Sequence, residues 1–296
     1  MSLSITVIGL GQMGGAMALT LQQAGFSVAG SDISADSRRR LADLGVPTTA
    51  PGDIVTSDVY LLSLPTSAQV REVIETSPGL LSLAPSGSVI VDTSTSDPAV
   101  SRELAAKVAA AGLKWLDAPV SGGPRGAASG TLGMLLGGDA DTVEHLRPML
   151  EAMSAKFTHV GGPGCGHTVK LANNYLCAAH LITTAEAVAL AARGGVDPSA
   201  CLAGLNSGSG RSAVSEVNFP EWVLSERFDS GFTMGLMRKD LGQAQAAAKA
   251  LGLSLPLLAQ VARAWQQSRD AIADGEDFNR IVTPVLQATT TEEPTP

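Results

Sequence analysis

The sequence has few aromatic residues, few charged residues and a deficit of basic ones. Aromatic side chains account for 4% of the 296 residues and charged side chains for 16%. Lys and Arg number 20 against 28 Asp and Glu, so the formal net charge is −8. A nucleic-acid backbone needs a basic face on its partner, and this balance argues against such a partner. The one basic run, Arg38 to Arg40, is expected to form a solvated helix face.

Cysteine is scarce, and the spacings typical of metal ligands are missing. Cys165, Cys177 and Cys201 lack the paired short spacings of a zinc site or a disulfide framework, which favours a reducing cytoplasm. The 4 histidines show no ligand spacing with one another, so no metal is predicted. An uninterrupted apolar stretch of about 18 residues, which a membrane span would need, is missing. The first residues enter a strand-like run without the pattern of a signal peptide.

Hydrophobic residues make up 45% of the chain, and their pattern changes once along it. Up to about residue 160, short β-branched runs alternate with Ala/Leu-rich helical stretches, which predicts βαβ units and a mostly parallel sheet. The expected strands are 5–8, 26–29, 59–62, 89–91, 114–118, 132–137 and 157–160.

After Gly166 the strand signal ends, and helical patterning continues to about Leu286. Glycine-rich breaks are expected at 194–195, 206–210 and 252. We therefore predict an α/β Rossmann dinucleotide-binding domain over residues 1–162, an all-α domain over 163–288 and a frayed tail over 289–296.

A glycine turn near the start of the chain predicts dinucleotide binding. It follows an apolar strand, opens an amphipathic helix and comprises Gly9, Leu10, Gly11, Gln12, Met13 and Gly14. Gly9 permits the tight turn, Gly11 lets the backbone approach a pyrophosphate, and Gly14 lets the helix pack closely on the strand. The alternative is a turn that only connects strand to helix.

Asp32 lies at the end of the second expected strand, 18 residues after Gly14. A carboxylate there would accept hydrogen bonds from the adenosine ribose and repel a 2′-phosphate, which favours NAD over NADP. Ile33 follows instead of an arginine, although Arg38 to Arg40 could approach the same place. Alternatively, Asp32 only begins a turn before the next helix.

A second glycine-containing stretch, Gly164 to Asn174, precedes a helix on which Lys170, Asn173 and Asn174 share one face at i, i+3 and i+4. Taken alone, this pattern is equally compatible with a solvated lysine and two satisfied amides. His167 could influence Lys170, but a histidine in a loop is more often solvated.

Two further segments complete a set of four motifs: Asp117 to Leu132, which contains Ser121-Gly122-Gly123-Pro124, and Met237-Arg238-Lys239-Asp240-Leu241. With these motifs in this order, the chain resembles the β-hydroxyacid dehydrogenase family of 3-hydroxyisobutyrate dehydrogenase and tartronate semialdehyde reductase, over nearly its whole length. The resemblance implies a Rossmann domain joined to an all-helical domain by a long helix.

The resemblance also implies the roles of individual residues. Lys170 is expected to be the catalytic acid/base, with Asn174, and with Asn173 beside it, on the substrate hydroxyl. Ser121, Gly122 and Gly123 are expected to receive the substrate carboxylate, and successive amides in such a turn do form an anion nest, although a plain loop is the alternative. Beside the cofactor the family places Leu64, Pro65, Thr95 and Lys239, with Asp240 close to the catalytic amine. Phe232 either walls the pocket or is a core aromatic.

The leading hypothesis is an NAD-dependent oxidoreductase that interconverts a small 3-hydroxy acid and its semialdehyde. The alternative is an NADPH-dependent reductase of tartronate or succinic semialdehyde. A third hypothesis is a non-catalytic dinucleotide-binding protein, which the presence of Lys170, Asn174 and Lys239 disfavours. A homodimer or homotetramer is expected, because the Ala-rich helical half carries few charges.

Overall fold

The computed structural model describes residues 3–76 and 78–287, so the predicted tail at 289–296 lies outside the described residues. The chain divides into two compact units, and Lys170 ends the first while Leu171 begins the second. The division falls within one long helix, α8 (Cys165–Arg193). The boundary predicted at residue 162 lies just before that helix and stays a prediction.

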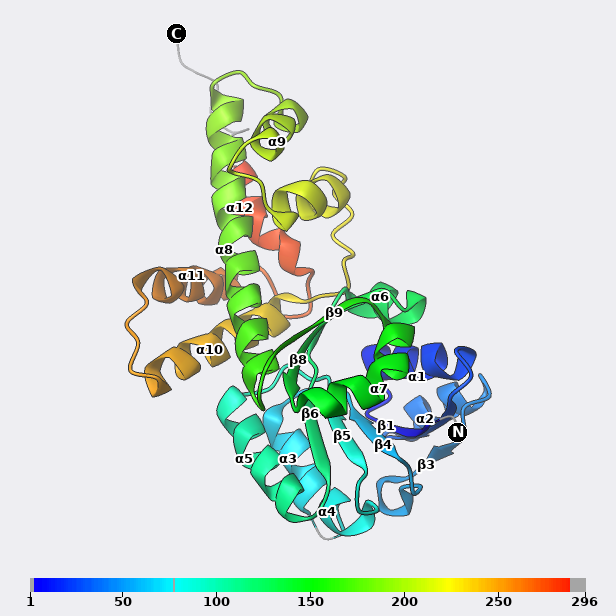
Figure 1. Ribbon diagram of the computed structural model, residues 1–296. Helices are drawn as coiled ribbons and strands as arrows, with labels where there is room; N and C mark the ends of the chain where they lie inside the picture. Colours follow the sequence, from blue (N-terminus) through cyan, green and yellow to red (C-terminus); the bar gives the residue numbers. More distant parts are fainter. Residues whose placement is uncertain (1–2, 77, 288–296) are drawn as a thin grey trace. The chain divides into compact units, whose positions relative to one another are not determined.

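The first unit is built on a twisted sheet in the order β3-β2-β1-β4-β5-β6-β8-β7, with β9 paired to β8 (Figure 1). The pairs from β3 to β6 are parallel, β8 is antiparallel to β6 and β7, and β9 is parallel to β8. The strands are β1 (Ser4–Ile8), β2 (Ser27–Ser31), β3 (Thr48–Thr49), β4 (Val59–Leu62), β5 (Val89–Asp92), β6 (Lys114–Asp117), β7 (Val120–Ser121), β8 (Leu132–Gly138) and β9 (Ser154–Gly161).

All seven predicted strands are present, and the two that the sequence pattern missed, β3 and β7, are two residues long. Such short segments carry too few residues for an alternating pattern to register. The order from β3 to β6 is that of a doubly wound dinucleotide-binding sheet, so the predicted Rossmann fold is confirmed.

Helices cover both faces of this sheet, which is why its central strands are buried throughout. Alternate residues point to opposite faces: Val7 and Leu61 pack in the cluster with α1, whereas Tyr60 and Leu62 pack in the cluster with α3 and α5. The helices of the unit are α1 (Gln12–Gln23), α2 (Ala35–Ala42), α3 (Ser67–Glu75), α4 (Leu80–Leu83), α5 (Pro98–Ala110), α6 (Gly123–Ser129) and α7 (Ala140–Met153), with a short η1 (Pro51–Asp53).

The second unit is helical, and its described residues contain no strand. Its own core includes Leu181 of α8, Phe219, Leu241 and the fully buried Trp265. Besides α8 it contains α9 (Pro198–Ser207), the π-helix η2 (Val214–Val223), α10 (Met234–Ala250), α11 (Pro256–Gln267), η3 (Ser268–Asp270), η4 (Phe278–Val282) and α12 (Thr283–Gln287). The expected breaks at 194–195 and 252 fall after α8 and after α10, and the one at 206–210 begins in the last two residues of α9.

Candidate active site

The glycine turn between β1 and α1 has the geometry that an approaching anion needs. Gly9 has a φ of 93°, and a Cβ there would lie 2.3 Å from the Ser63 carbonyl. A Cβ on Gly14 would lie 1.9 Å from the Gly9 carbonyl, whereas nothing lies within 4 Å of the position that a Cβ on Gly11 would take. No side chain caps α1. Free N–H groups and open space therefore coincide at Gly11, and the turn fits a dinucleotide pyrophosphate.

Asp32 follows β2 directly and is held by the same turn. Its Oδ2 accepts from the Leu10 amide over 2.6 Å, and its Oδ1 accepts from the Ser34 amide over 2.7 Å. Each ionised oxygen can accept a second hydrogen bond, so the carboxylate keeps capacity for ribose hydroxyls.

The predicted solvated face at Arg38 to Arg40 is wrong for Arg38, which is half-buried, whereas Arg39 and Arg40 are exposed. Arg38 donates to the Asp32 carbonyl over 2.5 Å, and Arg40 donates to the Leu10 carbonyl over 2.6 Å. Arg39 has a side chain that is 77% exposed and pairs with Asp36, and Arg40 stays exposed despite its contact with Leu10. The spacing of the three arginines could not reveal the contact of Arg40, because the Leu10 carbonyl lies 30 residues away in sequence.

The ends of β4 and β5 lie side by side, as expected for neighbouring parallel strands. The Leu64 amide donates to Ser94 Oγ over 2.9 Å, which ties the two loops together. Thr95 comes next and is half-buried, and Pro65 is exposed. Leu64, Pro65 and Thr95, which are predicted to lie beside the nicotinamide, thus follow the carboxyl ends of two neighbouring strands.

Ser121 ends β7, and the two glycines that follow adopt left-handed backbone, with φ of 118° at Gly122 and 62° at Gly123. Consecutive positive φ angles explain why glycine stands at both positions. Lys170 Nζ donates to Ser121 Oγ over 2.8 Å, although 49 residues separate them. Lys170 is buried, with 6% of its surface exposed. The structure therefore brings together the predicted catalytic amine and the predicted carboxylate-binding turn.

His167 is not solvated, and this corrects the expectation from the sequence. It lies in the first turn of α8 and is completely buried. Its Nε2 lies 2.9 Å from the Ser94 carbonyl and its Nδ1 lies 2.7 Å from Ser101 Oγ. The sequence signal was the histidine three residues before Lys170, but its partners are 73 and 66 residues away.

Asp117, the last residue of β6, receives the start of α8 and was not predicted as a site residue. Its Oδ1 accepts from the Gly164 amide over 2.7 Å and its Oδ2 from the His167 amide over 3.0 Å. Burial raises the pKa of this carboxyl above its ordinary value, against the opposing effects of His167 and of the two amides.

Within the second unit, the remaining predicted residues gather around Asp240 of α10. Asn174 Nδ2 donates to Asp240 Oδ2 over 2.6 Å, and Asn173 Nδ2 donates to Asn174 Oδ1 over 3.1 Å. Lys239 Nζ lies 3.4 Å from Asp240 Oδ1. Asn174 is one helical turn after Lys170 on α8, so one helix carries both.

Two other residues of the second unit have clear structural partners. Phe232 packs edge-to-face on Phe278, with ring centroids 5.2 Å apart, and its predicted contact with substrate stays a prediction. Arg238, next to Lys239, is fully buried and donates to the Trp265 carbonyl over 2.9 Å. The charged motif at 238–240 therefore contains a structural arginine, Arg238, and the carboxylate that binds Asn174, Asp240.

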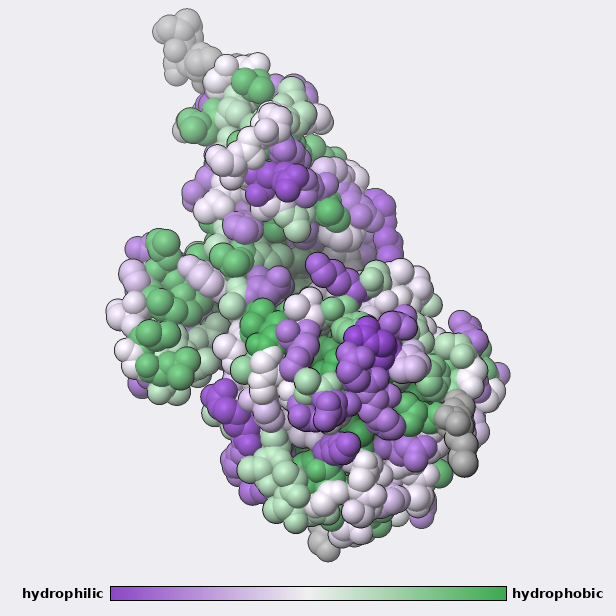
Figure 2. Space-filling model, in the orientation of Figure 1, coloured by the Kyte–Doolittle hydropathy of each residue, from purple (hydrophilic) through white to green (hydrophobic). Residues whose placement is uncertain are grey.

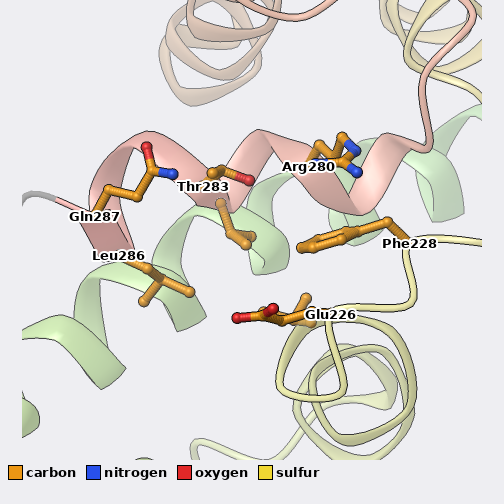
Figure 3. A pocket seen from close by; sticks show the side chains of 8 residues that line it. Glu226, Phe228, Arg280, Thr283, Leu286 and Gln287 are labelled. Carbon is orange, nitrogen blue, oxygen red and sulfur yellow. The ribbon is translucent and has the colours of Figure 1, made fainter.

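A separate hollow of about 490 Å³ in the second unit contains none of the predicted site residues (Figure 3). Glu226 and Phe228 border it with positive φ angles of 55° and 44°, and the Arg280 guanidinium stacks on the Phe228 ring. A hollow of about 660 Å³ in the first unit, lined in part by Trp115 and His159, also lies apart from those residues.

Among residues 3–76 and 78–287, no group of three His, Cys, Asp or Glu side chains is placed to hold a metal ion. In the same residues one helix, α8, is long and apolar enough to cross a bilayer by length and composition, which is weak evidence because core helices pass the same test. The sequence analysis found no such segment because it sought an uninterrupted apolar stretch. Polar residues interrupt α8, although its mean hydropathy is high.

Comparisons with known proteins agree with this arrangement. Residues 4–161 match the family described as the NAD-binding domain of 6-phosphogluconate dehydrogenase. Residues 164–285 match the family described as NAD-binding of NADP-dependent 3-hydroxyisobutyrate dehydrogenase. The chain belongs to the β-hydroxyacid dehydrogenase family. The resemblance drawn from its four motifs is thereby confirmed.

Individual relatives of this β-hydroxyacid dehydrogenase match it over most of its length. The NAD-dependent L-serine dehydrogenase of Pseudomonas aeruginosa is 37% identical, over 86% of this chain and 88% of its own length. The 2-hydroxy-3-oxopropionate reductase of Escherichia coli is 37% identical, over 84% and 85%. A Mycobacterium tuberculosis 3-hydroxyisobutyrate dehydrogenase structure with L-serine superposes with a TM-score of 0.88 at 33% identity, over 96% and 99%. The protein is therefore an NAD(P)-dependent dehydrogenase of hydroxy acids.

Proposed function

We propose that the protein is an NAD-dependent dehydrogenase that interconverts a small 3-hydroxy acid and its semialdehyde, with Lys170 as the general acid/base. The observation that carries the proposal is the 2.8 Å hydrogen bond from Lys170 Nζ to Ser121 Oγ at a buried position. An acid/base group beside a turn that can hold a carboxylate fits a substrate with a hydroxyl close to its carboxylate.

Oxidation of such a substrate removes a hydride from the carbon that bears the hydroxyl and a proton from the hydroxyl oxygen, leaving a carbonyl. NAD, held at the glycine turn of residues 9–14 and by Asp32, would supply the nicotinamide ring as the hydride acceptor. Lys170, in its neutral form, takes the hydroxyl proton, and in the reverse reaction its ammonium returns it. Ser121 with the amides of Gly122 and Gly123 binds the carboxylate, which fixes the reacting carbon.

Asn174 is proposed to orient the hydroxyl through its amide. Its Nδ2 is held by Asp240 over 2.6 Å, so the orientation of the amide is fixed within the second unit. Asn173, which donates to Asn174 Oδ1, supports the same orientation. Lys239, 3.4 Å from Asp240, is proposed to contact the cofactor.

NAD is proposed over NADP because the Asp32 carboxylate lies where a 2′-phosphate would bring a second negative charge. Two observations favour the alternative, an NADPH-dependent semialdehyde reductase: Arg38 and Arg40 lie within hydrogen-bond reach of the Asp32 and Leu10 backbone, and one relative is named a reductase. Titration of turnover with both cofactors in both directions separates the two proposals.

The substrate is tested by kinetics on L-serine, 3-hydroxyisobutyrate, glycerate, threonate and 4-hydroxybutyrate. Turnover of one or more 3-hydroxy acids with a kcat/KM well above that for 4-hydroxybutyrate supports the proposal. Preference for 4-hydroxybutyrate, or no turnover of any compound with either cofactor, would contradict it.

A homodimer or homotetramer is proposed from the surface of the second unit. Leu251, Leu253 and Leu255 in the connection between α10 and α11, and Leu257 in the first turn of α11, are 63%, 53%, 44% and 65% exposed. Figure 2 shows apolar surface over these two helices. Exposed apolar patches of this kind mark association surfaces. Light scattering that reports a monomer at micromolar concentration would contradict the proposal. A reducing cytoplasm remains the proposed compartment, in keeping with the lack of a disulfide at Cys165, Cys177 and Cys201.

A further inference from the structure

His167 makes two side-chain contacts that lock the first turn of α8 onto other parts of the first unit. Its Nε2 lies 2.9 Å from the carbonyl of Ser94, in the loop after β5. A carbonyl only accepts, so Nε2 carries the hydrogen. Its Nδ1 lies 2.7 Å from Ser101 Oγ on α5. The ring is completely buried, with Asp92 Oδ2 at 3.8 Å and Asp117 Oδ2 at 4.0 Å.

Ser94 is hydrogen-bonded within the loop that follows β5 and to the loop that follows β4. The Ser94 amide donates to Asp92 Oδ1 over 3.0 Å, and Ser94 Oγ accepts from the Leu64 amide over 2.9 Å. Thr95 is the next residue. The Nε2 hydrogen bond therefore joins α8 to the loops that follow β4 and β5.

The backbone at the start of the same helix is held by Asp117, which accepts from the Gly164 and His167 amides. Lys170 is three residues after His167, almost one turn further along α8. Because the helix is rigid between them, the position of the Lys170 amine follows from how this first turn is held.

We propose that His167 is a positioning residue for the reaction: its Nε2–H bond to Ser94 sets the distance between Lys170 and the Thr95 loop. The inference rests on the proposed function, in which Lys170 moves the proton and the Thr95 loop lies beside the nicotinamide. A displacement of about 1 Å at such a site can cost about 10²-fold in rate.

Two isosteric variants separate the Ser94 contact from the Ser101 contact. In His167→Gln the amide nitrogen can take the place of Nε2 and donate to Ser94. In His167→Asn the shorter amide lies near the position of Nδ1, where its oxygen can accept from Ser101 Oγ, and it cannot reach Ser94. Ser101→Ala is the matched control, since it removes the Nδ1 contact and leaves the Ser94 contact intact.

The expected result is turnover close to wild type for His167→Gln and Ser101→Ala, and a loss of about 10²-fold in kcat for His167→Asn. NAD affinity, measured by calorimetry, and substrate KM should stay near wild type in all three. The kinetic isotope effect on kcat for a substrate deuterated at the hydroxyl-bearing carbon should differ from wild type in His167→Asn, because the chemical step has been slowed. A smaller folded fraction would lower kcat without changing that effect.

The inference would be overturned by equal kcat values for the two His167 variants, by a larger loss in His167→Gln, or by a loss in Ser101→Ala as large as in His167→Asn. If His167→Asn does not fold, a large loss of kcat in folded His167→Gln overturns it and retained kcat supports it. Lys170→Ala, assayed beside these variants, separates a failure of the proposed function from a failure of the role of His167. Near-normal turnover in Lys170→Ala contradicts the proposed function. If Lys170→Ala loses turnover but His167→Asn is not slower than His167→Gln and Ser101→Ala, only the role of His167 is contradicted.

Discussion

Lys170 and Ser121, 49 residues apart in sequence, are joined by a 2.8 Å hydrogen bond in which the buried lysine is the donor. A lysine placed in this way has a fixed hydroxyl partner on a turn of two left-handed glycines. The pair gives the proposed acid/base group a defined position.

Lys170→Ala is expected to lose about 10²–10⁴-fold in kcat, the usual contribution of general acid–base catalysis, while NAD still binds to the separate glycine turn. Lys170→Arg should be no better, because a guanidinium stays protonated and cannot accept the hydroxyl proton. Turnover, calorimetric NAD binding and a thermal melt are measured on both variants. Rescue by arginine, or loss of folding in the alanine variant, would indicate a structural lysine.

Asp32→Ala is expected to narrow the preference for NAD over NADP, because it removes the ribose acceptor and the charge that repels a 2′-phosphate. Asp36→Ala is the control, since Asp36 is an exposed carboxylate on α2 with the same charge. The ratio of kcat/KM for the two cofactors is compared among the three proteins. An unchanged ratio in Asp32→Ala, or an equal change in both variants, would be evidence against the assignment.

Gly166→Ala is expected to displace the start of α8 and to lower both stability and kcat. A Cβ at Gly166 would lie 2.5 Å from the Leu135 carbonyl and 2.8 Å from the Asp117 carbonyl, both of which are backbone atoms. Overpacking of this kind costs about 1–3 kcal/mol. Gly162→Ala is the control, because a Cβ there meets nothing within 4 Å. Urea unfolding and kcat are the measurements, and equal behaviour of the two variants would rule out the close approach as the cause.

Asp117→Asn is expected to lower the free energy of unfolding by about 1–3 kcal/mol, because one amide oxygen cannot replace two carboxylate oxygens that each accept a buried N–H. The difference in the free energy of unfolding between wild type and Asp117→Asn should depend on pH. Burial raises the pKa of Asp117 in the folded protein, so the folded state binds the proton more tightly than the unfolded state does. The wild type therefore loses stability as pH rises from the ordinary carboxyl pKa of 3.8 through the raised pKa of the folded state.

Urea unfolding of wild type and Asp117→Asn at a series of pH values between about 4 and 7 measures this gap. It should be widest at the acidic end and narrow as the pH rises, since the variant lacks the titrating group. A gap that widens with pH would mean that the hydrogen bonds to the carboxylate outweigh its burial.

Local patterns in the sequence were enough to predict much of the fold. The alternation of apolar runs with helical stretches predicted seven strands, and the glycine turn before α1 predicted the dinucleotide-binding geometry that Gly9, Gly11 and Gly14 display. These features depend on neighbouring residues, so they can be read without knowledge of distant contacts. The resemblance carried by four motifs then led to the family.

Tertiary structure decided what depended on distant partners. The sequence could not show that β8 pairs antiparallel with β6, or that the two-residue β7 would carry Ser121 to Lys170. His167 was expected in solvent and is buried. A histidine's surroundings are set by whichever segments fold against it, here Ser94 and Ser101, and no local pattern encodes contacts across 66 to 73 residues.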